Sequence, residues 1–326
     1  MNLSSPDRPP PVVTIAMPVF NGGPEVHLAV RSLLVQSMSD WELLVMDDGS
    51  TDGQAAALAA LGDPRIRVLS DGENRGLAVR LNQAIDLARG RYFARMDHDD
   101  LAHPDRLRKQ IAKLEGDASL DLVACRCIRM NEDCELTGLQ PYAGRTHEDI
   151  CRHPWLRIRM AHPTWLGRIE WFRAHRYPDP APFYAEDFEL LLRAHEESRY
   201  TCLPELLMAR RVRSRIQWRK NLRARLAQFA VQRHYFLHRR RFSDAAKAAV
   251  MMVGRLLLDG WRLGSQATGM RLRSENAITP QDRAEWSELL GRFKTPRDSA
   301  RPQHGSATTV ELSAHEGNPV PARPPW

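Results

Sequence analysis

Three carboxylates fall within four positions directly after an apolar segment. They are Asp97, Asp99 and Asp100, and the segment before them is Tyr92–Met96. Carboxylates this close repel one another unless a cation neutralises them. Mg²⁺ and Mn²⁺ prefer oxygen ligands and are commonly held by one or two protein carboxylates together with substrate phosphates. The cluster therefore indicates a divalent-metal site, and the alternative is an acidic helix N-terminus ahead of Pro104.

A second acidic turn follows the apolar segment Trp41–Met46. Asp47 and Asp48 precede Gly49, which permits a tight turn, so the ordinary interpretation is a capped turn before a helix. If two acidic turns end two parallel strands, however, both face the same crevice. A carboxylate there can accept a hydrogen bond from a nucleobase or a ribose hydroxyl. The loop at 74–76 precedes the next helical segment and can shape the backbone against the same ligand.

Glu186 and Asp187 open a helical segment after a loop rich in proline and tyrosine. Carboxylates at a helix N-terminus commonly complement the helix dipole, and that is the structural interpretation. The functional interpretation is a general base held at the edge of the cleft. The pair alone does not decide between them.

The segments that must position these residues alternate between strand and helix. Strands are expected at Val12–Met17, Trp41–Met46, Arg65–Leu69 and Tyr92–Met96, with helices at Glu25–Met38, Asp52–Leu61 and Gly76–Ala88. This alternation predicts an α/β fold with a doubly wound, mostly parallel sheet, whose ligands bind beyond the carboxyl ends of the strands. Further on we expect helices at 105–114, 186–195, 216–239, 244–263 and 281–290, a strand at 120–126, and irregular structure over 130–182.

Charge is distributed unevenly along the 326 residues, which carry a net charge of +7. Residues 205–273 contain seventeen Lys and Arg against three Asp and Glu, a local charge of +14 that leaves −7 on the rest. A basic appendage on an acidic body attracts phosphates, which lipids, nucleic acids and lipid diphosphates all present. Since no recognised nucleic-acid motif accompanies it, we expect no nucleic acid and instead an anionic membrane surface bound through 205–273.

Several classes of protein are disfavoured. Five cysteines are too few for a disulfide scaffold, and the spacing of Cys125, Cys127 and Cys134 lacks a second ligand pair for zinc. No Gly-x-Gly-x-x-Gly follows a strand, which argues against a dinucleotide oxidoreductase. No apolar segment approaches the length of a membrane span, and the N-terminus does not read as a signal peptide. We therefore expect a cytoplasmic protein, peripheral on the inner face of the cell membrane.

Five segments in one order carry a resemblance to a known family. They are VVTIAMPVFN (12–21), LLVMDDGSTD (43–52), NRGLAVRLN (74–82), RYFARMDHDDLAHPDRL (91–107) and AEDFELLLR (185–193). Together they closely resemble the family 2 inverting glycosyltransferases of the GT-A fold, over about two thirds of the chain. The resemblance implies a nucleotide-sugar donor, most often UDP-linked, a divalent metal (Mn²⁺ or Mg²⁺), and a hydroxyl of a glycan or lipid-linked acceptor, in cell-surface polysaccharide or glycolipid synthesis.

The resemblance also implies roles for individual residues. Asp99 matches the direct metal ligand of an Asp-x-Asp motif that begins at Asp97, and Asp187 matches the catalytic base, with Glu186 as second choice. The donor would be bound by the segments after the first three strands: Pro18, Val19, Phe20, Asn21, Asp48, Asn74 and Gly76, together with Asp97. His162 lies where many relatives have a segment that faces the acceptor. Trp165, like Trp155 and Trp171, could provide a sugar-stacking platform for the acceptor, and the alternative is packing in the core.

Departures from the family narrow the expectation. Processive synthases carry a Gln-x-x-Arg-Trp motif that Ile216–Arg219 does not match, so transfer of one or a few sugars is favoured. The usual Tyr-Arg-x-His is replaced by the arginine-rich run 209–215, whose charges could substitute for a histidine at the diphosphate. Two alternatives stay open. One is a sugar nucleotidyltransferase, although its Gly-x-Gly-x-Arg loop is missing, and the other is a non-catalytic protein that binds nucleotides or nucleic acid.

Four regions are predicted along the chain. Residues 1–11 form a flexible leader. Residues 12–213 form the glycosyltransferase domain, with a donor half at 12–104 and an acceptor half at 105–213. A basic helical extension follows at 214–293, and a disordered tail at 294–326. The helix at 244–263 is apolar on one side, which suits either packing on the domain or a membrane interface. The sequence leaves the oligomeric state open.

Overall fold

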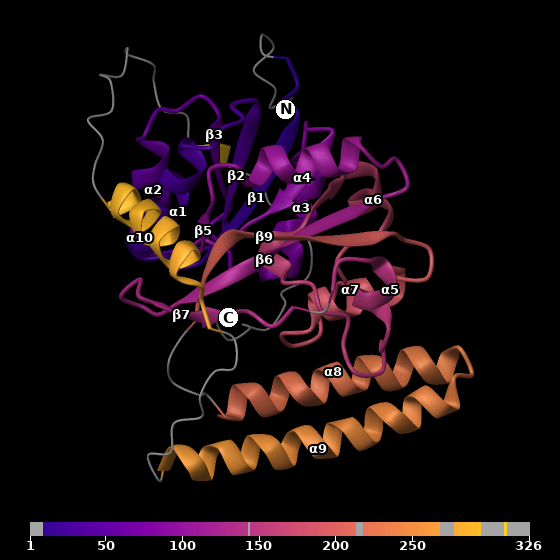
Figure 1. The fold of residues 1–326 in the computed structure, drawn as a ribbon. Helices are drawn as coiled ribbons and strands as arrows, with labels where there is room; N and C mark the ends of the chain where they lie inside the picture. The colour runs from indigo at the N-terminus through magenta and orange to yellow at the C-terminus, as the bar shows by residue number, and fades with distance from the viewer. Residues whose placement is uncertain (1–8, 143, 213–217, 268–276, 295–309, 312–326) are drawn as a thin grey trace.

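The computed structural model describes residues 9–142, 144–212, 218–267, 277–294 and 310–311. One mixed sheet of ten strands runs through the molecule in the order β10-β3-β2-β1-β4-β8-β6-β9-β5, with β7 paired to β6 (Figure 1). The pairs β2–β3, β1–β2 and β1–β4 are parallel, whereas β8 runs antiparallel to both β4 and β6. The described part of the chain is therefore an α/β protein built on one sheet.

The strands are β1 (Val13–Val19), β2 (Trp41–Asp47), β3 (Ile66–Ser70), β4 (Tyr92–Arg95), β5 (Leu101–Ala102), β6 (Leu122–Met130), β7 (Leu136–Leu139), β8 (Leu166–Arg168), β9 (Tyr200–Arg211) and β10 (Val310–Glu311). The helices are α1 (Glu25–Leu34), α2 (Gln54–Ala59), α3 (Leu77–Leu87), α4 (Arg106–Glu115), α5 (His147–Cys151), α6 (Ile169–Ala174), α7 (Glu186–Ala194), α8 (Trp218–His238), α9 (Phe242–Ala267) and α10 (Pro280–Lys294). A short 3-10 helix, η1, spans His162–Thr164.

The first two strands are buried on both faces, as their continuous apolar sequences require. Successive residues of β1 alternate between two cores. Ala16 packs with α3, α6 and α7, whereas Val13 and Ile15 pack with α1 and α4. The sheet is thus sandwiched between two helical layers, and the carboxyl ends of β1 to β4 lie at one edge.

The predicted strand–helix alternation over 12–96 is confirmed, with element ends displaced by up to four residues. The expectation of irregular structure over 130–182 is wrong, because β7, α5, η1, β8 and α6 fall there. These elements are short, and β8 is a strand because it bridges β4 and β6 rather than because of any pattern of its own. Strand β9 was not predicted, because its twelve residues include Pro204 and are interrupted by register shifts opposite β6.

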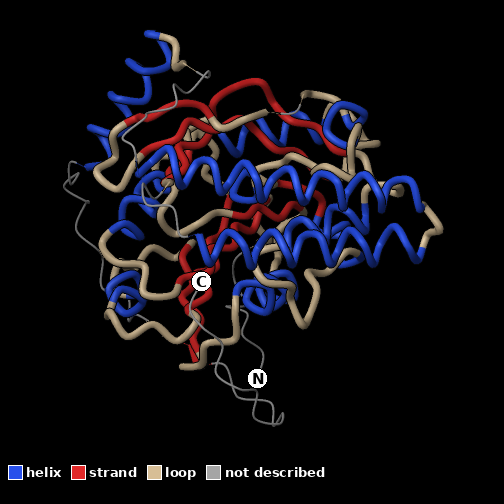
Figure 2. Tube along the Cα trace, turned by 90° about the horizontal axis from the view of Figure 1, so that it is seen from below, coloured by secondary structure: helices blue, strands red, loops and turns tan. Residues whose placement is uncertain are grey.

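Two regions follow β9. Helices α8 and α9 form an antiparallel hairpin that lies side by side across the lower face of the molecule (Figures 1 and 2). Helix α10 packs elsewhere, against α1 and the end of β6, through Trp286 and Phe293. None of the helices in the described ranges is long and apolar enough to cross a bilayer.

The predicted region boundaries stay predictions. Most of the leader 1–11 and of the tail 294–326 lies outside the described residues. The described parts are residues 9–11, Lys294 at the end of α10, and Val310–Glu311, which pair with β3. Of the run 209–219, residues 213–217 are outside the description as well.

Candidate active site

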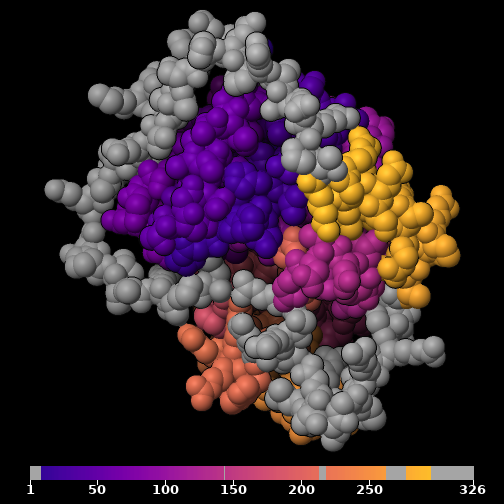
Figure 3. Space-filling model, turned by 90° about the vertical axis from the view of Figure 1, so that its left-hand side faces the viewer, coloured from indigo at the N-terminus to yellow at the C-terminus, as the bar shows by residue number. Residues whose placement is uncertain are grey.

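A cleft of about 610 Å³ opens at the carboxyl edge of the sheet. Its walls are the ends of β1, β4 and β9, the N-termini of α3 and α7, and the start of α8. Figure 3 shows the surface hollowed between the indigo N-terminal half and the orange residues of α8. A second recess of about 450 Å³ lies around Pro10, Arg89 and Arg173, at the opposite edge of the sheet. The first cleft is the one that collects the predicted carboxylates.

The acidic turn after β4 lies on the cleft with its charges poorly compensated. Carboxylate oxygens of Asp97, Asp99 and Asp100 lie within 4.8 Å of one another. Burial and the neighbouring charge of Asp97 raise the pKa of Asp99, and burial with both neighbours raises the pKa of Asp100 well above its usual range. The Oδ2 atom of Asp100 has no hydrogen-bond partner among the described residues. This donor set fits a hard divalent cation, which would relieve the repulsion and satisfy the free oxygens.

Two arginines accompany this turn. Arg95, the last residue of β4, forms an ion pair with Asp97, while its buried Nε and Nη1 atoms lack hydrogen-bond partners in the described structure. Arg210 reaches the cleft from β9, and the charges of Asp100 and Asp97 raise its pKa despite burial. The next residue, Arg211, donates from its backbone N–H to Asp100 Oδ1 at 2.8 Å. Strand β9 therefore brings cations to the acidic turn after β4.

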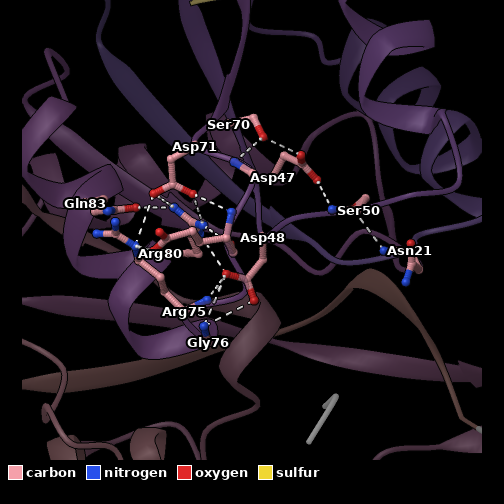
Figure 4. Close-up of polar contacts among 12 residues, drawn as sticks. Asn21, Asp47, Asp48, Ser50, Ser70, Asp71, Arg75, Gly76, Arg80 and Gln83 are labelled. Carbon is pink, nitrogen blue, oxygen red and sulfur yellow. Dashed lines mark hydrogen bonds and ion pairs between the residues drawn. The ribbon is translucent and has the colours of Figure 1, made fainter. Parts of the chain in front are cut away.

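The acidic turn after β2 has the opposite character, because internal partners hold it (Figure 4). Asp48 Oδ1 accepts hydrogen bonds from the backbone N–H of Arg75 at 2.8 Å, from that of Gly76 at 3.2 Å, and from Arg80 Nε at 2.7 Å. The guanidinium of Arg80 also donates to both oxygens of Asp71, at 2.6 and 3.0 Å. All three charged side chains are almost wholly buried.

Desolvation nevertheless raises the pKa of Asp48, against the lowering influence of these hydrogen bonds. The Asp48 side chain does not line the cleft. It instead fixes the loop at 74–76 that does so. Its predicted hydrogen bond to a base stays a prediction.

The other predicted donor residues divide into two groups. Pro18, Phe20, Asn74 and Gly76 line the cleft. Val19 is buried beneath it, and Asn21 is exposed beside it, where its Oδ1 accepts a hydrogen bond from the backbone of Thr51 at 2.9 Å. The second group thus supports the turn after β2 rather than the cleft wall.

The carboxylates of α7 face the same cleft from the opposite side. Glu186 and Asp187 occupy the first turn of the helix, and both line the cleft. Burial, and then the charge of Asp187, raise the pKa of Glu186 to about 8. Asp187 Oδ1 accepts a hydrogen bond from the backbone N–H of Phe188 at 2.7 Å. Glu186 therefore keeps its proton at neutral pH.

The two residues predicted to face the acceptor differ in their placement. His162 lines the cleft, and its Nε2 lies 2.7 Å from the hydroxyl of Tyr177. Burial lowers the pKa of His162 well below its usual range, so its ring is neutral. Trp165 is fully buried behind it, with ring centroids 4.6 Å apart. The prediction that Trp165 touches the acceptor is wrong for this structure, because its ring belongs to the core.

Helix α8 contributes two cations that sequence reasoning did not place at the site. Lys220 Nζ lies 4.0 Å from the ring centroid of Tyr184, and the Arg223 guanidinium lies 4.0 Å from that of Phe183. The two rings stack edge to face at 4.4 Å just before α7, and Tyr184 adopts a left-handed backbone with φ of +50°. The only signal in the sequence was the general excess of basic residues beyond 205, which carries no information on where each side chain lies.

Residues 14–174 match the sequence profile of glycosyl transferase family 2. A succinoglycan biosynthesis protein (ExoO) of Rhizobium meliloti is 36% identical over 137 residues, or 40% of this chain and 39% of that protein. In Escherichia coli, a UDP-Glc:alpha-D-GlcNAc-diphosphoundecaprenol beta-1,3-glucosyltransferase (WfgD) is 34% identical over 32% of this chain and 41% of that protein. The chain thus aligns with well under half the length of these two relatives.

Solved structures share the fold across most of the chain. The crystal structure of Staphylococcus aureus TarS 1–349 superposes with a TM-score of 0.58 at 16% identity, over 86% of this chain and 79% of that one. A mannosyltransferase of Pyrobaculum calidifontis, in complex with GDP-Man and Mn²⁺, gives 0.54 at 18% identity, over 87% and 85%. The predicted GT-A fold is confirmed, and through residues 14–174 the chain belongs to glycosyl transferase family 2.

Proposed function

We propose that this protein transfers a sugar from a nucleotide-sugar donor, most simply a UDP-sugar, to a hydroxyl of a glycan or lipid-linked acceptor. One observation carries the proposal: the acidic turn after β4 and the carboxylates of α7 line the same cleft. A group that binds the leaving diphosphate and a group that takes the acceptor's proton are the two elements that direct displacement requires.

The donor would lie between the loop at 74–76 and the turn after β4. Asp99, with Asp97 and Asp100 beside it, would hold a divalent cation, Mn²⁺ or Mg²⁺, and their mutual repulsion supports that assignment. When bound, such an ion supplies Lewis-acid neutralisation of the diphosphate. Arg95 and Arg210 add fixed positive charge at the same place. TarS has been solved with UDP and UDP-GlcNAc, and the mannosyltransferase with GDP-Man.

The acceptor hydroxyl would attack the anomeric carbon while the bond from that carbon to the diphosphate breaks, and the electron pair leaves on the diphosphate. Asp187 takes the hydroxyl proton, a contribution of about 10²–10⁴-fold to the rate. Glu186 keeps its own proton at neutral pH, so Glu186 is not available to accept the acceptor's proton there. A single displacement inverts the configuration at the anomeric carbon.

The place of this reaction would be cell-surface polysaccharide or glycolipid synthesis at a membrane. Two relatives are named for succinoglycan biosynthesis and for a diphosphoundecaprenol-linked acceptor. The α8–α9 hairpin supports docking on an anionic surface. Along the outer side of α9, Phe242, Val250 and Leu257 recur at helical spacing and are 64–71% exposed. Exposed basic residues of the hairpin add positive charge: Arg219 near the start of α8 and Arg240 in the turn between the two helices.

The docking part of the proposal is tested with vesicles. Flotation with phosphatidylglycerol vesicles at low salt should recover the protein, whereas neutral vesicles should not. Val250→Ser with Leu257→Ser should reduce recovery about tenfold, because two apolar side chains no longer enter the interface. Leu61→Ser is the control, since Leu61 is an exposed apolar residue outside the hairpin. Equal recovery of the double variant and the control would exclude docking through α9.

The transfer reaction is tested by incubating the protein with a panel of nucleotide sugars and Mn²⁺ and measuring release of the nucleotide. We expect slow hydrolysis of one donor class. In the presence of the acceptor, Asp187→Asn should lose turnover yet bind the donor as the wild type does, because a base acts on the acceptor proton. Near-normal turnover of Asp187→Asn would place the base elsewhere, and Glu186 would be examined next.

A further inference from the structure

Six cations converge on the side of the cleft that α8 forms. Arg157, Lys220 and Arg223 line the cleft itself. Behind them lie three more arginines that act on one another electrostatically: Arg159, Arg225 and Arg255. We call these six residues the cationic wall. They come from the segment before η1, from α8 and from α9, so the hairpin is part of the cleft and not only an appendage.

Contacts within the protein hold these long side chains in place. Lys220 and Arg223 each lie 4.0 Å from an aromatic ring centroid, which fixes their charged ends beside the cleft at little entropic cost. Arg255 donates to the backbone carbonyl of Leu156 at 2.7 Å and to Gln228 Oε1 at 3.2 Å. A set of ordered cations loses less freedom when it binds an anion than a set of mobile ones does.

The charges of four of the wall's arginines are incompletely balanced. Arg225 pairs with Asp259 at 3.2 Å, and within the described ranges it is the one member of the four arginines 157, 159, 225 and 255 with an ion pair. Burial, and then the charges of the other three, lower the pKa of Arg255 to about 10. Crowding of like charges is unfavourable unless an anion joins them.

The cleft has two groups of cations with different neighbours. The carboxylates that act most strongly on Arg210 are Asp100 and Asp97, so this residue belongs to the metal-binding turn. The carboxylate that acts on Arg157 is Asp187. The cationic wall therefore adjoins the base, and Arg210, which also acts on Arg157, links the wall to the turn after β4. An anion bound there would lie on the acceptor side of the reaction.

We propose that the cationic wall binds a phosphate or diphosphate group of the acceptor, and so selects acceptors that carry one close to the reacting sugar. This inference rests on the proposed sugar transfer, because only that reaction makes the bound molecule an acceptor. The anion site itself does not depend on the reaction. A phosphate at Arg157 and Arg223 would set the acceptor hydroxyl against Asp187. The neighbouring apolar stripe of α9 would then face the lipid to which such a diphosphate is attached.

The experiment measures binding of inorganic pyrophosphate to the full-length protein by calorimetry, in EDTA and at fixed ionic strength. Without metal, the Asp97 and Asp99 carboxylates disfavour binding of the probe beside Arg95 and Arg210, and variants of the wall show whether the probe binds there. Arg157→Gln and Arg223→Gln should each weaken binding about tenfold, as loss of a charge-assisted hydrogen bond implies. Both residues are exposed, so neither substitution removes core packing, and thermal melts verify folding. Arg233→Gln, an exposed arginine of α8 outside the wall, should leave binding unchanged.

Absence of pyrophosphate binding, or equal loss in Arg233→Gln, would overturn the proposal. Asp99→Asn separates it from the proposed function. This variant should lose metal-dependent donor binding while it keeps, or slightly improves, pyrophosphate binding in EDTA. A wild type that binds pyrophosphate in this way but shows no donor binding would refute the transferase proposal and leave the anion site standing.

Two competitors then distinguish the sources of the phosphate. Farnesyl diphosphate represents a lipid diphosphate, and glycerol 3-phosphate represents a unit of a phosphate-linked polymer. Displacement of pyrophosphate by either one supports the wall as an acceptor site and identifies which class of acceptor it selects. Displacement by neither at millimolar concentration would refute the acceptor assignment.

Discussion

The turns after β2 and β4 are both rich in aspartate, but the protein compensates these carboxylates far better in the first turn than in the second. Both carry adjacent carboxylates at the carboxyl end of a parallel strand, on either side of β1. In the first turn, Asp48 is matched by Arg80 and by backbone N–H groups. In the second, an oxygen of Asp100 has no hydrogen-bond partner among the described residues, and like charges of neighbouring carboxylates help to raise the pKa values of Asp99 and Asp100.

The difference shows that a run of carboxylates does not by itself mark a metal site. What matters is whether the fold supplies a cation of its own. Arg80 enters the first turn from α3, fully buried, and bridges Asp48 to Asp71. In the second turn Arg95 pairs with Asp97 and Arg210 lies nearby, but neither Asp99 nor Asp100 has an ion pair among the described residues. The first turn has its buried charges paired within the protein, whereas the second turn has carboxylates that lack such partners.

The largest expected effect is on the second turn. Asp99→Asn should reduce donor turnover by about 10³-fold or more, because the leaving diphosphate loses most of its neutralisation. The melting temperature should not fall, since the substitution removes one of several repelling charges. Turnover with Mn²⁺ and thermal melting are the two measurements. A variant with lowered melting temperature and normal turnover would show that the second turn is structural.

Arg80→Met tests the first turn. It leaves Asp48 and Asp71 buried without their counter-charge, so the free energy of unfolding should fall by about 3–5 kcal/mol in a urea titration. Arg91→Met is the matched control, because the Arg91–Glu115 ion pair is about half exposed and should contribute about 1 kcal/mol or less. Similar losses in both variants would contradict a special role for the buried network.

The carboxylate pair of α7 extends the comparison to a third acidic site. The pKa of Glu186 is raised to about 8, so the protein holds its proton at neutral pH and releases it above pH 8. In the unfolded chain Glu186 is ionised from about pH 4.5, whereas the folded protein keeps it protonated up to about pH 8. Glu186 therefore lowers the free energy of unfolding by an amount that grows from about pH 4.5 to 8. The profile of kcat/KM against pH should bend near pH 8. Glu186→Gln should remove this bend while folding stays intact, and a bend that persists would assign it to another group.

The smallest expected effect compares two glycines of the first turn. Gly49 and Gly53 both have positive φ, at +78° and +76°. A methyl group at Gly49 would lie 2.9 Å from the backbone of Glu73, whereas at Gly53 it would meet nothing within 4 Å. Gly53→Ala should cost about 1 kcal/mol of stability through backbone strain alone, and Gly49→Ala about 1 kcal/mol more. Equal losses would mean that the loop at 72–74 yields freely and does not brace the turn.

The parts of the site that could be predicted from the sequence are those that directly follow a strand or begin a helix. Strands β1 to β4 are continuous apolar runs, so the residues after them could be assigned to one edge of the sheet, and Asp97, Asp99, Glu186 and Asp187 all line the cleft. Partners that come from distant segments were not predictable. No pattern in the amino-acid sequence links Asp48 to Arg80, which lies 32 positions later.

The same limit explains the missed parts of the acceptor side. Strand β9 has an interior proline and register shifts, so its periodicity is broken and the strand was missed, although the arginine-rich run 209–215 was expected at the diphosphate and Arg210 lines the cleft. The position of Lys220 and Arg223 depends on how α8 folds back over Phe183 and Tyr184, which is a matter of tertiary packing. Trp165 was misassigned because a tryptophan suits both a sugar platform and a core, and only the packing decides.

The most direct test of the central claim is to titrate Mn²⁺ into the protein in the presence of UDP and follow free Mn²⁺ by electron paramagnetic resonance. The wild type should bind one Mn²⁺ in a UDP-dependent manner. Asp99→Asn should lose this binding, and Asp71→Asn, which alters the internally paired turn, should retain it provided that circular dichroism shows it folded. Equal Mn²⁺ binding by Asp99→Asn and the wild type, or a loss confined to Asp71→Asn, would contradict the assignment of the two turns.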